Sequence, residues 1–414
     1  MRGSGNILSK CESLTLPKVT FWRVVVVLIL GAGLYATFLR FFQGFQASTN
    51  LSDPVPWGLW VGLNTLCGVG LSAGGFAIAA AVYILGLERY RPVLRASILI
   101  SFLGYLTVIS GMMFELGLPW RIWHPLVMWN FRSVLFDVAW CVMLYTTVLA
   151  LEFSPAMFER FRLHKLGEWQ HRILIGLVLA GVILSSGHQS FLGGLYLIMK
   201  GKLHPLWYSS QLPALFFASA IAAGLALTIM VLYLSVRSLG VRVDFRILQE
   251  VSRVIVLVLA FYTLFRAIDL LYQGNGRYLF ELRSETGWFW LEIALLVAAP
   301  LILYNLRRVQ MSPLGLYWTS ALVVMGFMTN RINVSITGLL GSAGVNYVPK
   351  WSEMAASLAI FTAAAVAFRY AVLYLPIFPR VAQTIHPQME WNQGMNYTLP
   401  PRPTYAVPQS PRVH

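Results

Sequence analysis

Titratable side chains stand within otherwise apolar stretches of this sequence, where they could take up and release protons. Asp137 is the clearest case, because the basic residue before it, Arg132, is five positions away and off its helical face. Burial of an unpaired carboxyl group favours its protonated form, which is the form that a proton relay needs. We therefore interpret Asp137 as the strongest single candidate for proton transfer, with His188 and Glu292 as further candidates.

Other polar residues have a structural interpretation beside a functional one. Arg266 and Asp269 are three residues apart on one helical face, so an internal ion pair is as plausible as a ligand role. In the same way, Glu292 and Arg331 could neutralise each other between two helices. Glu115 lies so near a helix end that ordinary solvation is the favoured interpretation.

The elements that carry these residues are long and apolar. Of the 414 residues, 57% are hydrophobic and only 11% are charged, whereas a soluble domain carries about 25% charged residues. A bilayer core of about 30 Å needs roughly 20 apolar residues of helix. The segments that meet this length are 21–42, 57–87, 94–117, 131–152, 171–199, 212–236, 250–272, 287–306, 314–336 and 352–375. The prediction is an all-α integral membrane protein with ten transmembrane helices.

Basic residues set the predicted orientation, because they concentrate in cytoplasmic loops. Most of them lie on the side of the N-terminus. The opposite loops hold only Arg121, Arg132, Lys200, Lys202, Arg277, Arg283 and Lys350. We therefore expect a cytoplasmic segment 1–20, a membrane domain 21–375 and a cytoplasmic, proline-rich tail 376–414, with both termini in the cytoplasm. The net charge of +15 is attributed to this topology and not to nucleic-acid binding.

With this orientation, nearly all the polar residues fall in the outer third of the membrane, which indicates one polar cavity open toward the outer side. Their placement also repeats. In spans three, four and five an ionisable residue lies late, early and late along the span, namely Glu115, Asp137 and His188. The same order recurs in spans seven, eight and nine with Asp269, Glu292 and Arg331. This pattern predicts two four-helix bundles, spans 2–5 and 6–9, flanked by one helix at each end. Small residues in the second span favour close helix packing, namely Gly68, Gly70, Gly74 and Gly75.

Several kinds of redox centre are not supported by the sequence. The three cysteines, Cys11, Cys67 and Cys141, form no C-x-x-C pair, so no iron–sulfur or zinc ligand set can be written. Haem b needs histidine pairs at matching depths, and only His188 lies deep within a span. No phosphate-binding loop or dinucleotide fingerprint is present. We expect no metal, haem or iron–sulfur cluster in this chain.

Two neighbouring runs carry a family resemblance: Glu115-Leu116-Gly117-Leu118-Pro119-Trp120-Arg121-Ile122-Trp123, and Asn130 to Asp137. They resemble the NrfD/polysulfide-reductase membrane-subunit family. Further motifs are similar to its ten-helix HybB-type branch, the membrane subunits of periplasmic [NiFe] hydrogenases. These are Pro56-Trp57-Gly58, Ala73-Gly74-Gly75, the run 150–160, His188-Gln189-Ser190, His204-Pro205-Leu206-Trp207, Phe289-Trp290-Leu291-Glu292 and Pro349-Lys350-Trp351-Ser352-Glu353.

The resemblance implies a subunit without a redox cofactor of its own, in the bacterial inner membrane. Such subunits bind menaquinone or ubiquinone near the periplasmic face, beside a ferredoxin-like iron–sulfur subunit and the small and large hydrogenase subunits. The implied quinone-site residues are Trp60, Asn64, Arg121, Trp123, His124, Asp137, His188 and Gln189, with Arg266, Asp269 and Arg331 as a second-bundle cluster. One departure is that Asn64-Thr65-Leu66-Cys67 stands where polysulfide-reductase members place a histidine.

The resemblance implies that electrons from hydrogen oxidation reach the quinone here, with proton uptake. One alternative is the equivalent subunit of another quinone-linked complex, such as polysulfide or sulfite reductase or alternative complex III. Another alternative is an ion-coupled secondary transporter. That class would need discontinuous helices and a midplane site, and the polar groups here are predicted to lie off the midplane.

Overall fold

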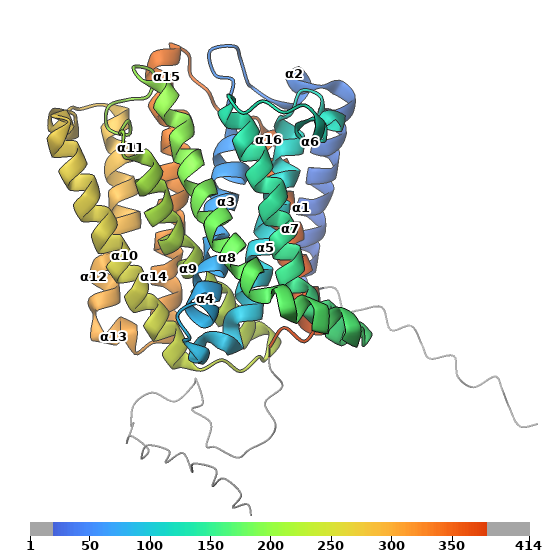
Figure 1. Ribbon diagram of the computed structural model, residues 1–414. Helices are drawn as coiled ribbons and strands as arrows, with labels where there is room; N and C mark the ends of the chain where they lie inside the picture. The colour runs from blue at the N-terminus through green and yellow to red at the C-terminus, as the bar shows by residue number, and fades with distance from the viewer. Residues whose placement is uncertain (1–19, 379–414) are drawn as a thin grey trace, which may run out of the picture. The chain divides into compact units, whose positions relative to one another are not determined.

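The computed structural model describes residues 20–378 and is built of helices (Figure 1). Nine helices of this part of the chain are long and apolar enough to cross a membrane. The all-α membrane fold is thereby confirmed. The predicted span 314–336 forms a helix that is not one of these nine, so the count of ten remains a prediction. The predicted terminal segments 1–20 and 376–414 lie almost entirely outside the described residues.

The helices follow the predicted spans closely, with short helices in the connections. Their bounds are α1 (Phe21–Phe38), α2 (Phe45–Ser48), α3 (Gly68–Leu71), α4 (Ala73–Tyr83), α5 (Arg91–Glu115), α6 (His124–Val127), α7 (Val134–Phe161), α8 (His164–Leu195), α9 (Leu212–Leu239), α10 (Phe245–Tyr272), α11 (Ser284–Ile293), α12 (Ala299–Asn305), α13 (Arg307–Gln310), α14 (Pro313–Ile332), α15 (Gly338–Ala343) and α16 (Trp351–Tyr374). Helix α7 continues past the predicted end at 152, and α8 begins before the predicted start at 171.

Helix boundaries coincide with capping side chains. Ser133 accepts a hydrogen bond from the Phe136 amide before α7, and Ser312 accepts one from the Gly315 amide before α14. At the other end, Gly240 takes a positive φ of 67° and ends α9. These residues fix where the apolar helices start and stop, and so they set the depth of the polar side chains.

Several helices contain wider, π-helical turns. They occupy Leu39–Gln43, Trp60–Cys67, Ala294–Ala298 and Asn333–Thr337. The second of these holds Asn64, the third begins two residues after Glu292, and the fourth begins at Asn333. Such turns often occur at functional sites, and here all four hold or adjoin buried polar side chains, since the first holds Arg40.

The helices form two groups that contact each other, while the division into two four-helix bundles remains a prediction. The segment 60–83 packs with α5 and α8, and both of these helices pack with α7. Helix α9 packs with α10 and α14, and α14 packs with α11 and α12. Helices α4 and α8 contact α9 and so join the two groups. The first and last long helices, α1 and α16, lie side by side, and α16 packs on α5 (Figure 1). Both flanking helices are therefore on the side of the first group.

Two ends of the helix assembly are distinguished below. The α6 end carries α2, α6, α15 and the connection 200–211, and the α13 end carries α13 and the connection 84–90 (Figure 1). Lys350 joins parts of the α6 end, because its Nζ donates to the Ala47 carbonyl at 2.6 Å.

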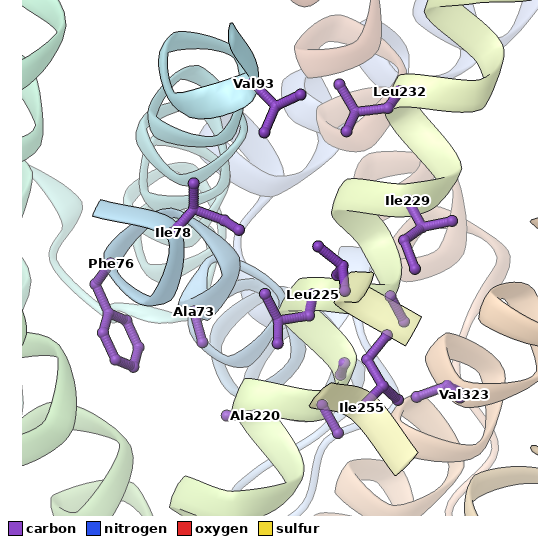
Figure 2. Packing of buried hydrophobic residues seen from close by; sticks show 14 of the residues in the cluster. Ala73, Phe76, Ile78, Val93, Ala220, Leu225, Ile229, Leu232, Ile255 and Val323 are labelled. Atoms are coloured by element: carbon purple, nitrogen blue, oxygen red, sulfur yellow. The ribbon is translucent and has the colours of Figure 1, made fainter. Parts of the chain in front are cut away.

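The apolar core lies where the two groups meet. Figure 2 shows buried side chains from α4, α5, α9, α10 and α14, among them Ile78, Val93, Leu225, Ile255 and Val323. Backbones approach closely there, since a Cβ on Gly74 would lie 2.4 Å from the Gly224 carbonyl oxygen. A Cβ on Gly70 would lie 2.1 Å from the Phe327 ring. The packing interpretation of these glycines is confirmed.

Candidate functional site

His188 is the centre of the first polar cluster. It lies late in α8 and is 0% exposed. The Tyr105 hydroxyl of α5 lies 2.8 Å from its Nδ1, while its Nε2 is buried and has no hydrogen-bond partner. Buried polar atoms are nearly always paired. An unpaired imidazole nitrogen is therefore free to bond a ligand or a water molecule.

Asn64 is the second partly bonded residue of this cluster. It is fully buried in the π-helical segment of the second span, and its Oδ1 accepts from the Ser357 hydroxyl of α16 at 2.7 Å. Its Nδ2 has no partner. Asn64 packs at Gly111 of α5, six residues beyond Tyr105, which is about 9 Å along the helix. Asn64 and His188 therefore each contact α5, and no hydrogen bond joins the two side chains.

Two other predicted quinone-site residues are occupied by protein contacts. The Gln189 amide donates to the Val69 carbonyl at 2.8 Å and so ties α8 to α3. The Trp60 indole donates to the Glu353 carbonyl at 3.3 Å and packs on Phe114. Both side chains are buried, and these bonds give them a role in holding helices together.

The predicted residues at the α6 end lie apart from His188. Arg121 and Trp123 are exposed, and His124 is half-buried in α6. Asp137 stands in the first turn of α7, where the helix dipole favours a carboxylate. Its side chain is half-buried. Asp137 is therefore less deeply enclosed than His188, and its role in proton transfer remains a prediction.

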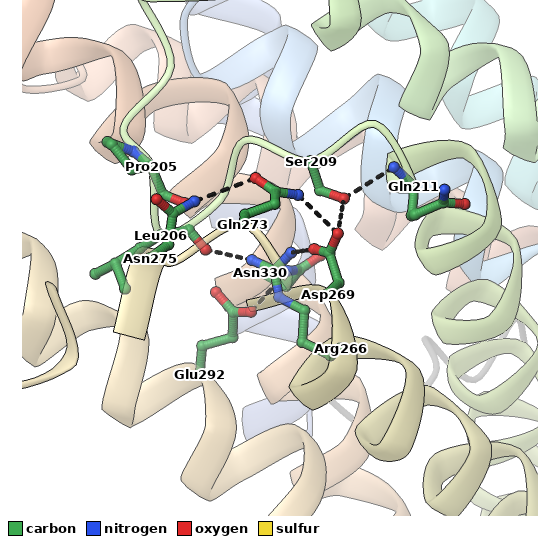
Figure 3. A network of polar contacts seen from close by, with 10 residues as sticks. All are labelled: Pro205, Leu206, Ser209, Gln211, Arg266, Asp269, Gln273, Asn275, Glu292 and Asn330. Carbon is green, nitrogen blue, oxygen red and sulfur yellow. Dashed lines mark hydrogen bonds and ion pairs between the residues drawn. The ribbon is translucent and has the colours of Figure 1, made fainter. Parts of the chain in front are cut away.

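The second polar cluster surrounds Glu292 of α11, which is 0% exposed (Figure 3). Its Oε2 accepts from the Trp207 indole and from the Asn333 amide, each at 2.9 Å. Its Oε1 accepts from the Asn330 amide at 2.7 Å. Three side-chain donors therefore hold the two oxygens of one carboxyl group in place.

Arg331 does not pair directly with Glu292, contrary to one interpretation of the sequence. Its guanidinium donates to the Asn330 Oδ1, and to the Phe216 carbonyl and Ser219 hydroxyl, both at 3.0 Å. It also lies 3.6 Å from the centre of the Phe216 ring. Asn330 bridges the two charges, because its amide group offers both a donor and an acceptor.

The ion pair expected between Arg266 and Asp269 is present. Their side chains are buried and lie 3.4 Å apart. Asp269 also accepts from the Ser209 hydroxyl at 2.8 Å and the Gln273 amide at 2.7 Å, and Arg266 donates to the Leu206 carbonyl (Figure 3). These bonds attach α10 to the connection 200–211.

The two polar clusters differ in which of their polar atoms lack a hydrogen-bond partner. A cavity of only about 10 Å³ adjoins Arg266, Asn330 and Arg331. The second cluster is thus closely packed and, apart from the Asn333 Oδ1, bonded throughout. The first cluster keeps free polar atoms on His188 and Asn64. Its geometry is the better suited of the two to bind a polar head group.

Three further buried residues were not predicted as site residues. Tyr105 gives no sequence signal, since tyrosine is common in membrane helices. Trp207 belongs to the motif His204-Pro205-Leu206-Trp207, which predicts no hydrogen bond to Glu292. Glu353 ends the motif Pro349-Lys350-Trp351-Ser352-Glu353; it is 0% exposed and accepts bonds from the Asn50 amide at 2.9 Å and the Lys350 amide at 3.1 Å.

Outside the membrane segments, one histidine is perturbed. His204 lies in the connection 200–211 and is half-buried. Partial burial lowers its pKa, and the neighbouring acids Glu285 and Glu281 act in the opposite direction. Its Nδ1 accepts from the Leu206 amide at 3.2 Å, so the neutral ring has a structural role in this turn.

A multi-helix membrane protein with buried polar clusters near one end is the class that this geometry defines. The chain belongs to the polysulphide reductase NrfD family, whose model matches residues 47–343. The family expected from the sequence is thereby confirmed.

Related proteins match along nearly their whole length. A protein of Nitratidesulfovibrio vulgaris is 37% identical over 86% of this chain and 94% of its own. The probable Ni/Fe-hydrogenase 2 b-type cytochrome subunit of Escherichia coli K12 is 27% identical, over 93% of this chain and 97% of its own. The integral membrane subunit of a menaquinone reductase of Nitratidesulfovibrio vulgaris is also 27% identical, over 90% and 95%.

Proposed function

We propose that this chain is the quinone-reactive membrane subunit of a respiratory [NiFe] hydrogenase complex. It anchors the hydrogenase small and large subunits and a ferredoxin-like iron–sulfur subunit. Electrons from hydrogen pass through their clusters to menaquinone or ubiquinone. Membership of the NrfD family and the similarity to a hydrogenase subunit along the chain support this proposal.

The observation that carries the quinone site is the buried, unpartnered Nε2 of His188. A quinone carbonyl accepts hydrogen bonds, and an imidazole N–H in an apolar surrounding is a strong donor for it. The bond to Tyr105 holds the ring in place. We propose Asn64, Asp137, Arg121, Trp123 and His124 as further residues of the quinone site.

The name of the Escherichia coli relative includes a b-type cytochrome, which implies haem. Bis-histidine haem needs two buried imidazoles facing each other. Among the histidines whose side chains the structure describes, only His188 is buried, and its Nδ1 is engaged by Tyr105. The residues described here do not fit a haem, and the proposed electron path does not use one.

A second candidate is the membrane subunit of another quinone-linked complex. It is favoured by the menaquinone reductase relative, whose identity to this chain equals that of the hydrogenase relative. The two candidates differ in the partner subunits and the electron donor, and they share the quinone chemistry.

Affinity purification of the tagged chain from its native membrane decides between them. We expect hydrogenase small and large subunits and an iron–sulfur subunit to co-purify, and the complex to reduce a menaquinone analogue with hydrogen as the donor. Co-purification of a different oxidoreductase, with no hydrogen-dependent quinone reduction, would favour the second candidate.

We also propose that the α6 end faces the periplasm of a bacterial inner membrane and that both termini are cytoplasmic. Reporter fusions at Pro54, Lys202 and Lys350 are then expected to report the periplasm, and a fusion at His414 the cytoplasm. The reason is the concentration of basic residues on the opposite side. A periplasmic signal from His414 would reverse the orientation.

A further inference from the structure

A cavity lies at the α13 end of the first helix group, apart from the two polar clusters described above. A cavity of about 640 Å³ is bounded there by α5, α7 and α8. Exposed charged residues, among them Arg91, Glu159 and Glu168, stand at its mouth. Its deeper wall carries Glu152, which is only 8% exposed.

Glu152 has no ion-pair partner among the described residues. Of the basic residues that line the cavity, Arg91 pairs with Glu88 at 2.5 Å, Arg95 pairs with Glu159 at the cavity mouth, and the exposed His171 is not paired with Glu152. Gln170, on the same wall, is 3% exposed and its Nε2 has no partner. An acid that is buried in the wall of a cavity with charged residues at its mouth, and that is free of ion pairs, can bind and release a proton.

Polar side chains continue from Glu152 toward the α6 end. On α8, Gly181, Ser185 and His188 are four and three residues apart and share a face; on α7, Tyr145 and Glu152 are seven apart and share another. A Cβ at Gly181 would lie 3.3 Å from the Glu152 Oε1 and 3.7 Å from the Tyr145 ring. The absence of that Cβ lets Glu152 and Tyr145 both lie against α8 at this position.

The upper part of this path reaches His188. Ser185 lies beside the Tyr145 hydroxyl, although neither group has a hydrogen-bond partner. The rings of Tyr145 and Tyr105 lie 4.7 Å apart, and the Tyr105 hydroxyl lies 2.8 Å from the His188 Nδ1. All four side chains are 0% exposed. Hydroxyl groups both donate and accept hydrogen bonds, and bridging water molecules can link such groups into a proton path.

We propose that Glu152 takes up protons at the α13 end and that Tyr145, Ser185 and Tyr105 pass them to His188. This inference rests on the proposed quinone chemistry. Each quinone accepts two electrons from the partner iron–sulfur subunit and two protons, and becomes a quinol. A proton that enters at Glu152 crosses most of the membrane before it reaches the head group, so quinone reduction moves positive charge from the α13 side to the α6 side.

The test uses the complete complex in liposomes, with hydrogen as the donor and a menaquinone analogue as the acceptor. We expect Glu152→Gln to lower quinone reduction at least tenfold and to abolish proton uptake from the α13 side, measured with a pH dye on that side. Tyr145→Phe keeps the ring and removes the hydroxyl, so a smaller fall of the same kind is expected. Hydrogen-dependent reduction of an artificial dye, which bypasses this subunit, should be unchanged.

Glu250→Gln is the matched control. Glu250 is a partly buried acid at the same end, but it belongs to α10, pairs with Arg89 at 2.9 Å and does not line the cavity. Its variant should keep normal quinone reduction and proton uptake. If Glu152→Gln also keeps both, the path is overturned while the proposed function stands. If the wild-type complex reduces no quinone, the proposed function and this inference fail together.

A second measurement needs no quinone turnover. An apolar carbodiimide modifies protonated carboxyl groups in membrane cavities, and mass spectrometry of the treated complex locates the adduct. We expect an adduct at Glu152 and none at Glu292, which is enclosed by three donors. An unmodified Glu152 would show that the acid is not an accessible proton carrier.

Discussion

Replacing Glu292 by alanine is expected to lower the free energy of unfolding by about 3 kcal/mol or more. The change leaves the Trp207 indole and the Asn330 and Asn333 amides without their acceptor. Each buried donor that loses its partner costs about 1–3 kcal/mol. Denaturant titration of the purified complex in detergent, followed by tryptophan fluorescence, measures the effect.

Glu285→Ala is the control on the same helix. Glu285 is half-buried and its carboxylate contacts the Ser284 hydroxyl at 3.0 Å, so a change within about 0.5 kcal/mol is expected. Glu292→Gln should fall between the two, because its amide keeps one acceptor but turns a donor toward the other donors. If Glu292→Ala unfolds like the wild type and loses only quinone reduction, Glu292 is a proton relay and not a structural acceptor.

Asp137→Asn is expected to lower hydrogen-dependent quinone reduction about 10²-fold, the usual scale of an acid–base contribution. Quinone reduction takes up two protons, and Asp137 is an acid near the α6 end without an ion-pair partner among the described residues. Asparagine keeps the volume and hydrogen bonding and removes the titratable proton. Assembly and hydrogen oxidation with an artificial dye should persist.

Asp53→Asn serves as the control, since Asp53 is an exposed acid of the same end. Its variant should behave as the wild type. Quinone reduction within a fewfold of normal in Asp137→Asn would show that this acid carries no essential proton. Entry at Glu152 would then have to supply both protons.

Much of the fold follows from the sequence because lipid imposes a simple condition. Backbone polar groups in a bilayer must be bonded within the chain, so a long apolar segment has to be a helix. The spans and their order are therefore readable from the residues alone. The motif at residues 115–137 likewise predicted the NrfD family, which the comparison confirmed. The close glycine contacts between α4 and α9 were also predictable, because small residues permit them.

The polar clusters show what the sequence left open. Asp137 and Glu292 occupy equivalent places in the predicted repeat, yet Asp137 is half-buried at a helix start while Glu292 is enclosed by three donors. The difference comes from Trp207, in a connection 85 residues earlier, and from Asn330 and Asn333 on the following membrane helix. Spacing along one helix gives no information about such distant partners.

The same limit applies to His188 and Glu152. The sequence placed His188 at the right depth, but only the tertiary structure put the Tyr105 hydroxyl on one of its nitrogens and left the other free. Glu152 looked like an ordinary acid at a membrane boundary. Packing of α5, α7 and α8 buried it in the wall of a cavity and aligned it with Tyr145 and Ser185. Hydropathy and spacing determined which residues enter the membrane, whereas helix packing decided which of them are bonded, because partners are chosen in space and not along the chain.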